Sequence, residues 1–479
     1  MTEPCQLGAT QARRLIGRKA LSPVELMESC IDQIEAVDPA LNAVVCKPYD
    51  QARTAAKAAE DAVMRGDPLP ALHGLPVGIK DLNDTAGITT TYGSVPYKDH
   101  VPEEDETSVA GLRAAGGIVL AKTNTPEFGA GGNTDNALHG PTRNPFSLEK
   151  TCGGSSGGSA VVLAADMMPL ALGSDTGGSL RLPATFNGIV AFRPSIGVVP
   201  SSARDSMLTT YQTKGPMARS VADTSLMLAA MAGFDPVDAM AFPRDASQYL
   251  SMQDVDLSTL RVAVSTDLGC APTSKNVRAL FEARVPEFAS VFKSVTWIDP
   301  PFDNILDVFW KLRGIYMMAK HADKIDGYGA ETNPNVTSNV AAAAAMTMAE
   351  IGSATKAQLD IYLAFQEYFQ GIDLLICPGV TVEPFPFDTL YPEEVDGEPL
   401  ENYVHWAGLT SSLTVVGHPV VAMPCGMDTQ GTPYGIQVCG PMHGDRFTLG
   451  AAHALEQVFA DNPLLARPLP DFGMLRGAA

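Results

Sequence analysis

Residues 151–195 read TCGGSSGGSAVVLAADMMPLALGSDTGGSLRLPATFNGIVAFRPS, and this stretch decides how the whole chain is interpreted. It contains two glycine-flanked serine clusters, around Ser155 and Ser179, which lie 24 residues apart. Glycine adopts positive φ readily, so the backbone N–H groups of such a segment can point at one spot. An oxyanion hole requires donors fixed in this way before charge develops on a carbonyl oxygen. The pattern therefore predicts a nucleophilic serine beside a cradle of backbone amides.

Outside this stretch, short β-branched runs alternate with amphipathic segments. This alternation is typical of an α/β fold in which helices cover both faces of a sheet. Residues 1–70 are predicted to form a helical segment packed on the core. Residues 71–479 are predicted to form a single domain, with a largely helical region at about 235–370 and an irregular loop at 378–404. The expected strands lie at 75–80, 118–122, 189–192, 260–264, 374–377 and 420–423.

The charge balance excludes several classes of partner. The chain of 479 residues holds 54 acidic residues against 33 Lys and Arg, which gives a formal net charge of -21. Nucleic acids and anionic membranes are poor partners for such a surface. The first twenty residues lack the apolar run of a signal peptide, and the eight scattered cysteines form no Cys-x-x-Cys pair. We therefore expect a cytoplasmic protein with reduced thiols and a small-molecule substrate. A homodimer is one oligomeric state that the sequence allows.

Two familiar interpretations of the glycine-rich stretch fit poorly. Gly153, Ser155 and Gly157 match G-x-S-x-G, but no histidine sits in a context that suggests a Ser-His-Asp triad. The stretch also lacks the Lys-Ser/Thr pair of a phosphate-binding P-loop. No His, Cys or Asp cluster has the spacing of a zinc site, so we expect no metal.

Lys80 is a candidate for the base that a serine nucleophile needs. It closes the apolar segment LPVGIKD, where burial favours the neutral amine. A neutral lysine can accept the proton of a serine. The structural alternative is a lysine that extends from a strand end into solvent. Spacing alone leaves both alternatives open.

The motifs GGSSGGSA and GSDTGGSLRLPA at this spacing resemble the amidase signature family of serine amidohydrolases. Further segments resemble family landmarks in family order: GLPVGIKD, the stretch 123–145, GPMARSVAD, GHPVVAMPCG and GIQVCG. The resemblance covers nearly the whole chain outside about 235–370. It implies a large central mixed β-sheet covered by helices.

The resemblance also implies roles for individual residues. Ser179 corresponds to the nucleophile, Ser155 to a bridging serine held by a cis peptide bond, and Lys80 to the terminal base. The oxyanion hole would consist of the backbone amides of Thr176, Gly177, Gly178 and Ser179. Asp175 and Arg181 are expected to brace this loop, while Ser156 and Asp81 are expected to hydrogen-bond the bridging groups. No cofactor is implied.

The expected reaction is hydrolysis of a small carboxylic amide, aryl or aliphatic, through an acyl-enzyme. A carbamate or a cyclic amide would use the same residues, and a glutamyl-tRNA amidotransferase A subunit or an inactive scaffold are further alternatives. The loop 378–404 combines aromatic residues with acids, so it is predicted either to cover the pocket or merely to anchor itself to the core. As an acidic lid it would favour neutral substrates. Its region holds Glu383, Asp388, Glu393, Glu394, Asp396, Glu398 and Glu401.

Overall fold

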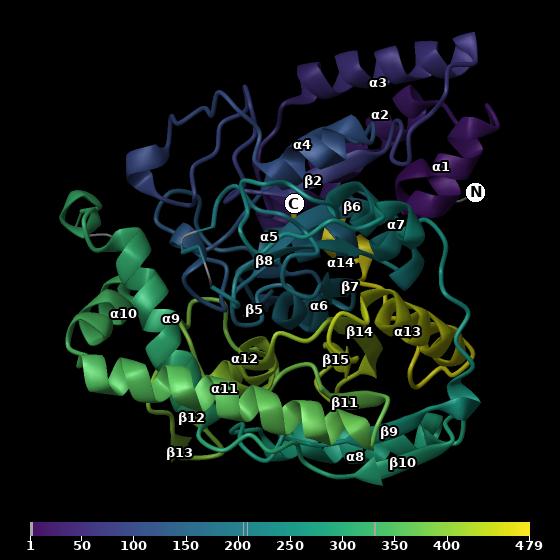
Figure 1. Cartoon of the computed structure of the whole chain (residues 1–479). Helices are drawn as coiled ribbons and strands as arrows, with labels where there is room; N and C mark the ends of the chain where they lie inside the picture. The colour runs from purple at the N-terminus through teal and green to yellow at the C-terminus, as the bar shows by residue number, and fades with distance from the viewer. Residues whose placement is uncertain (1–2, 205, 208, 330–331) are drawn as a thin grey trace.

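A mixed β-sheet of 11 strands runs through the centre of the molecule in the computed structural model (Figure 1). The structure describes residues 3–204, 206–207, 209–329 and 332–479. In sheet order the strands are β1 (Val44–Cys46), β3 (Ile118–Thr123), β2 (Pro76–Lys80), β6 (Leu170–Asp175), β8 (Thr213–Ala218), β7 (Val190–Arg193), β14 (Val420–Met427), β15 (Pro433–Cys439), β11 (Leu374–Pro378), β9 (Arg261–Val264) and β10 (Ser294–Trp297).

The sheet combines parallel and antiparallel pairs. β2 runs parallel to both β3 and β6, whereas β8 pairs antiparallel with β6 and β7. The strands near the middle are buried along their whole length, as expected for a sheet covered on both faces. The predicted α/β fold is confirmed, and all six expected strands are present.

Residues 3–70 contribute a strand as well as helices. Helices α1 (Ala9–Gly17), α2 (Pro23–Leu41) and α3 (Tyr49–Arg65) lie together at one end of the molecule (Figure 1). Helix α2 begins with a capping box, in which the Ser22 hydroxyl accepts from the N–H of Glu25 and the Glu25 side chain accepts from the N–H of Ser22. β1 pairs antiparallel with β3, so this segment also supplies an edge strand, which its sequence did not predict.

The remaining helices pack around the sheet. Two of them matter most for the site: α5 begins directly after the first serine cluster, and α6 begins directly after the second. Both are wholly buried: small and apolar side chains occupy all faces of α5, whereas α6 also buries the charged Arg181 and the polar Asn187. The helices outside residues 3–70 and 235–370 are α4 (Thr107–Ala114), α5 (Gly157–Ala164), α6 (Arg181–Asn187), α7 (Val221–Met231), α12 (Gly408–Val416), α13 (Asp445–Ala460) and α14 (Phe472–Ala478).

Helices predominate in the described part of the region at 235–370. Helices α10 (Pro334–Ala344) and α11 (Met348–Gln370) both pack on α9 (Ile305–His321) at one side of the molecule, and α8 (Lys275–Ala289) lies beside β11 (Figure 1). The region also supplies strands β9 and β10 at the far edge of the sheet. Helix α9 borders the candidate site described below.

Short elements complete the chain. The loop 378–404 is irregular apart from the hairpin of β12 (Glu394–Val395) and β13 (Glu398–Pro399), and β4 (Arg143–Asn144) pairs with β5 (Ser147–Thr151). Among the described residues, no helix is long and apolar enough to cross a bilayer. The 3₁₀ helices are Pro4–Gln6, Val95–Tyr97, Glu127–Gly129, Ala246–Tyr249, Leu257–Thr259, Ile325–Gly327 and His405–Ala407.

Candidate active site

Lys80 lies at the end of β2 and is completely buried. Its Nζ lies 2.7 Å from Ser155 Oγ, 3.0 Å from Ser156 Oγ and 3.1 Å from Ser174 Oγ. No described carboxylate forms an ion pair with this amine. Lys80 therefore does not extend into solvent, and three serine hydroxyls surround it.

The surroundings of Lys80 favour its neutral form. Burial lowers the pKa of Lys80 well below its usual value, and the positive charges of Lys214 and Lys320 lower it further. A neutral amine donates two hydrogen bonds and accepts one, which matches three hydroxyl neighbours. Because the Ser156 hydroxyl already donates to the carbonyl of Ser174 at 3.2 Å, Ser156 accepts from Lys80. The nearest hydroxyl, that of Ser155, is then able to donate to the amine.

Ser155 and Ser156 stand at the entrance to α5. The peptide bond between Gly154 and Ser155 is cis, as the family resemblance implied. The N–H of Ser156 donates to the carbonyl of Ser179 at 3.2 Å, which joins the two serine clusters directly. Gly157 fits closely here, since a Cβ at this position would overlap the side chains of Thr134 and Cys152.

The loop between β6 and α6 presents several backbone amides beside Ser179. In the described chain the N–H groups of Thr176, Gly177 and Ser179 have no hydrogen-bond partner. The N–H of Gly178 differs from the expectation, because it donates to Asp175 Oδ1 at 2.8 Å. Three of the four expected donors are therefore unoccupied, and the fourth holds the loop in shape.

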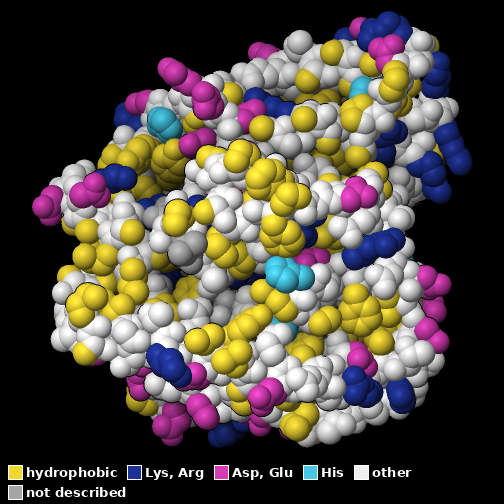
Figure 2. All heavy atoms as spheres, in the orientation of Figure 1, with side chains coloured by type: hydrophobic (Ala, Val, Ile, Leu, Met, Phe, Trp, Pro, Cys, Tyr) yellow, Lys and Arg dark blue, Asp and Glu magenta, His cyan; other side chains and the backbone are white. Residues whose placement is uncertain are grey.

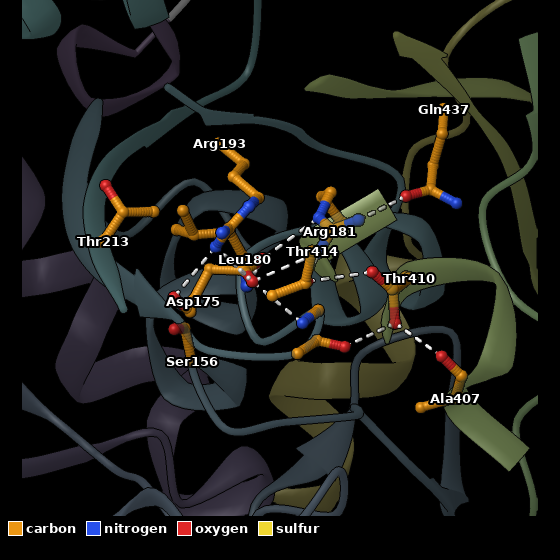
Figure 3. Close-up of polar contacts among 12 residues, drawn as sticks. Ser156, Asp175, Leu180, Arg181, Arg193, Thr213, Ala407, Thr410, Thr414 and Gln437 are labelled. Carbon is orange, nitrogen blue, oxygen red and sulfur yellow. Dashed lines mark hydrogen bonds and ion pairs between the residues drawn. The ribbon is translucent and has the colours of Figure 1, made fainter. Parts of the chain in front are cut away.

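A buried ion cluster supports this loop (Figure 3). Asp175 receives Arg181 in a two-pronged pair, Nε to Oδ2 at 3.0 Å and Nη2 to Oδ1 at 3.1 Å. Arg193 Nη1 donates to Asp175 Oδ1 at 3.0 Å, and all three side chains are fully buried. Burial alone would raise the pKa of Asp175, but the two guanidinium groups outweigh it and hold the pKa well below its usual value.

Arg181 connects the loop to the C-terminal part of the sheet. Its Nη1 donates to Gln437 Oε1 at 2.9 Å, and its Nη2 donates to Thr414 Oγ1 at 2.8 Å. Asp175 occupies the remaining donors, so the guanidinium has no free edge. Sequence reasoning missed Arg193, Thr414 and Gln437, because no local motif marks them.

One expected supporting contact is wrong. Asp81 follows Lys80 but forms no hydrogen bond with Ser155 or Ser156. Its carboxylate accepts from the N–H and hydroxyl of Thr91 and lies 3.9 Å from Lys122 Nζ. The reason is the strand geometry, since consecutive side chains point to opposite sides. Asp81 therefore stabilises the turn after β2 on the side away from the serines.

A pocket of about 410 Å³ opens beside the two serine clusters. Ser155, Ser174, Ser179 and the loop residues Thr176, Gly177 and Gly178 line it. Aromatic side chains line another part, where Tyr92 contacts Tyr97 edge to face at 5.1 Å and Phe128 stacks obliquely on Tyr328 at 4.6 Å between ring centroids. Lys80, Ser156, Asp175 and Arg181 lie behind this surface. The pocket therefore gives direct access to Ser155 and Ser179 but not to the groups that support them.

The prediction that an acidic loop covers the pocket is wrong. None of the acidic residues between Glu383 and Glu401 lines the pocket, and Asp84 is the single carboxylate among its described lining residues. The aromatic residues in and after this loop differ in position. Tyr403 and Trp406 line the pocket, whereas Phe385 packs against Trp406 outside the pocket lining. The acids point elsewhere because the loop 378–404 packs along β5 and α8 through contacts such as Phe387 N–H to Glu149 O and Lys275 N–H to Asp396.

Known proteins resemble this chain along almost its whole length. The protein family described as Amidase matches residues 25–449. An acylamidase of Rhodococcus erythropolis is 32% identical over 457 residues, which cover 94% of this chain and 95% of that protein. The A subunit of a glutamyl-tRNA(Gln) amidotransferase from Synechococcus elongatus is 32% identical over 462 residues, or 92% and 95% of the two chains.

Solved structures agree with this assignment. A bacterial aryl acylamidase of the amidase signature enzymes superimposes with a TM-score of 0.87 at 27% identity, over 98% of each chain. A 6-aminohexanoate cyclic dimer hydrolase gives a TM-score of 0.84 at 24% identity, which is a likeness of fold. The fold and these relatives define an enzyme that hydrolyses amides. The chain belongs to the amidase signature family.

Proposed function

We propose that this protein hydrolyses a small carboxylic amide with Ser179 as nucleophile, Ser155 as proton relay and Lys80 as base. The observation that carries the proposal is the fully buried Lys80 amine, which has no described carboxylate partner and is surrounded by three serine hydroxyls. Burial lowers the pKa of Lys80 and so favours the neutral amine, which can take the proton of Ser155. Ser155 in turn takes the proton of Ser179 as Ser179 attacks the carbonyl.

The proton relay requires the two serine hydroxyls to come together during the reaction. Both line the same pocket, and the backbone link from Ser156 N–H to Ser179 O fixes their segments side by side. No hydrogen bond joins the two hydroxyls in the structure, where that of Ser155 lies against Lys80. Catalytic hydrogen bonds are often long in empty sites and shorten when substrate binds. The same relay, run in reverse, protonates the leaving amine as the C–N bond breaks. The acyl group stays on Ser179 until water hydrolyses it.

The free amides of Thr176, Gly177 and Ser179 are the proposed oxyanion hole. They are held in place before the reaction, so they need no rearrangement when the carbonyl oxygen becomes negative. Loss of one such donor typically costs about 2.7–4 kcal/mol of transition-state stabilisation. The buried cluster of Asp175, Arg181 and Arg193 supports the loop that carries these amides, without contacting the substrate.

The pocket walls favour an aryl group on one side of the scissile bond. Tyr92, Tyr97, Phe128 and Tyr328 form a continuous aromatic wall. Such rings bind an aromatic group by edge-to-face and offset contacts. The names of two similar proteins, an acylamidase and an aryl acylamidase, agree with an acylated aryl amine as substrate.

The experiment that tests this function is covalent labelling combined with turnover. A fluorophosphonate should add one adduct to Ser179, identified by peptide mass spectrometry, and block hydrolysis of 4-nitroacetanilide and related anilides. Ser179→Ala should lose the adduct and the activity while its circular dichroism spectrum stays unchanged. An adduct on Ser155 with Ser179 unmodified would reverse the assignment of nucleophile and relay.

The alternative of a glutamyl-tRNA amidotransferase A subunit calls for a separate test, because similar proteins of both kinds share 32% identity with this chain. Such a subunit needs its partner subunits for RNA-linked activity. Gel filtration of the protein, alone and mixed with amidotransferase partner subunits, measures whether a complex forms. We expect hydrolysis of free amides by the protein alone, and no complex.

A further inference from the structure

We propose that the substrate amide carries a carboxylate group and that Arg313 binds it. The inference rests on the proposed function, since it concerns the same pocket, and it specifies the substrate class. It replaces the neutral substrate predicted from the sequence, whose basis was an acidic lid that does not line the pocket.

Cationic side chains outnumber carboxylates in the wall of the pocket, although the molecule as a whole is acidic. Five cationic side chains line it against the single carboxylate of Asp84. On the face shown in Figure 2, the acidic side chains lie mainly along the outer margins. A concave site of one charge sign concentrates small ligands of the opposite sign. The five cations are Arg204, Lys214, Arg313, Lys320 and Lys324.

Burial and pairing together single out Arg313 among these cations, because Lys320 is half-buried, Lys324 is exposed and the other two are paired with carboxylates. Arg204 is neutralised by Asp238, with Nη2 2.6 Å from Oδ2, and Lys214 lies 3.2 Å from Glu106 Oε2. Arg313 forms no ion pair with any described carboxylate. Its Nη1 donates to the neutral amide oxygen of Asn339. The Arg313 side chain is therefore buried, with 8% of the residue exposed, and no described carboxylate neutralises its charge.

The two remaining donors of Arg313 have the geometry that recognises a carboxylate. Among the described residues, the nitrogens Nε and Nη2 of Arg313 have no hydrogen-bond partner. These two adjacent nitrogens form one edge of the guanidinium. Arg181 uses the same edge to hold both oxygens of Asp175 in this protein. Two parallel charge-assisted hydrogen bonds of this kind are among the strongest polar contacts available. A ligand carboxylate would accept two hydrogen bonds from Arg313, as Asp175 does from Arg181.

Tyr403 supplies an independent sign of a polar ligand. Its ring lies under the guanidinium of Arg313, with 5.4 Å between Cζ and the ring centroid, and it lines the same pocket. Tyr403 is 6% exposed, and its hydroxyl has no hydrogen-bond partner among the described residues. A buried hydroxyl without a partner is costly, so such groups usually bind something. A carboxylate beside Arg313 would accept this hydrogen bond.

Helix α9 sets the distance between the carboxylate and the reacting bond. Phe309 packs against Gly177 of the proposed oxyanion hole, since a Cβ on Gly177 would lie 2.7 Å from Phe309 Cζ. Arg313 follows one helical turn later, which is about 6 Å along the helix axis. The carboxylate should therefore sit a few bonds from the scissile carbonyl, as in an anilide of a short dicarboxylic acid.

A pair of matched sulfonyl fluorides tests the inference without a known substrate. The probes are 4-(fluorosulfonyl)benzoic acid and its methyl ester, which differ by one negative charge. Ser179 should displace fluoride from each, and each inactivation rate is divided by the hydrolysis rate of that probe in buffer. We expect the corrected rate for the acid to exceed that for the ester at least tenfold at low salt. A faster reaction of the ester would overturn the inference.

Two variants assign the preference to Arg313. Arg313→Met should lower the acid-to-ester ratio about tenfold, and Tyr403→Phe, which removes one hydroxyl, should lower it about threefold. Arg65→Met removes the same charge from the exposed end of α3 and should leave the ratio unchanged. An unchanged ratio in Arg313→Met or Tyr403→Phe would contradict the inference. If neither probe labels Ser179 in the unmodified protein, the proposed function itself fails.

Discussion

Thr410 packs directly against Gly178, so closely that a Cβ atom on Gly178 would overlap the Thr410 hydroxyl. Thr410 Oγ1 lies 2.8 Å from the carbonyl of Gly177, to which it donates, and Gly178 has a φ of 130°. Glycine alone satisfies both the close contact and this backbone conformation. A residue of α12, more than 200 positions along the chain, therefore shapes the proposed oxyanion hole.

Gly178→Ala should lower turnover about 100-fold or more. The added methyl group must displace Thr410 or the loop, and a shift of about 1 Å in catalytic geometry can lower a rate about 100-fold. The measurement is kcat for an anilide, with the melting temperature as a check on folding. Gly66→Ala is the matched control, because Gly66 also has positive φ (79°) but has open space around it. Equal losses of activity in both variants would refute the role of the Thr410 contact.

Lys80→Arg should be almost as damaging as Lys80→Met. The proposed mechanism needs a neutral amine, whereas a guanidinium stays protonated at every usable pH. In the unmodified protein kcat/KM should rise with pH until Lys80 has lost its proton, and it should level off well below pH 10.5, since the pKa of Lys80 is lowered. Exposed Lys57→Arg serves as control. Substantial turnover by Lys80→Arg would eliminate Lys80 as the base.

Lys214→Met should move the acidic limb of this pH profile to higher pH. Lys214 is the strongest of the charges that lower the pKa of Lys80 after burial itself. Its removal also leaves the Glu106 carboxylate uncompensated, which raises the pKa of Lys80 in the same direction. The variant should therefore lose most activity at low pH and recover part of it at high pH. A limb that stays in place would show that Lys214 does not influence the base.

Asp175→Asn should destabilise the protein strongly. The substitution leaves the buried Arg181 and Arg193 without their counter-charge, and such losses cost about 3–5 kcal/mol. Since the folded-state pKa of Asp175 is depressed, its contribution is complete above its ordinary pKa of 3.8 and is lost as the pH falls below that value. Urea unfolding at pH 7 and at pH 3 measures both effects. Exposed Asp61→Asn should change stability by less than about 0.5 kcal/mol.

The strands that the sequence predicted are those with β-branched runs. β2 and β3 read PVGIK and IVLAKT, and their burial on both faces favours such residues. β6 and β8 read LALGSD and TKGPMA, which contain residues of low strand propensity, and neither was predicted. Their place in the middle of the sheet depends on pairing with each other and with neighbouring strands. Tertiary context here overrides local preference.

The residues of the candidate site also fall into those that local sequence located and those that it did not. Ser155, Ser179 and the loop amides lie within two short motifs, so local patterns and the family resemblance located them. Arg181 donates hydrogen bonds to Thr414 and Gln437, which lie 233 and 256 residues away in the sequence. No local sequence pattern reveals such contacts. The basic pocket wall was missed for a related reason. The net charge of -21 is a property of the whole chain and does not say which side chains face the cavity.

The reach of Arg181 sets an order of events during protein synthesis. Lys80, Ser155 and Ser179 all leave the ribosome within the first 40% or so of the chain, whereas Thr414 and Gln437 emerge close to its end. The loop that carries the proposed oxyanion hole therefore cannot be fully braced on an unfinished chain. A nascent polypeptide that already holds all three proposed catalytic residues would stay inactive until its last strands joined the sheet.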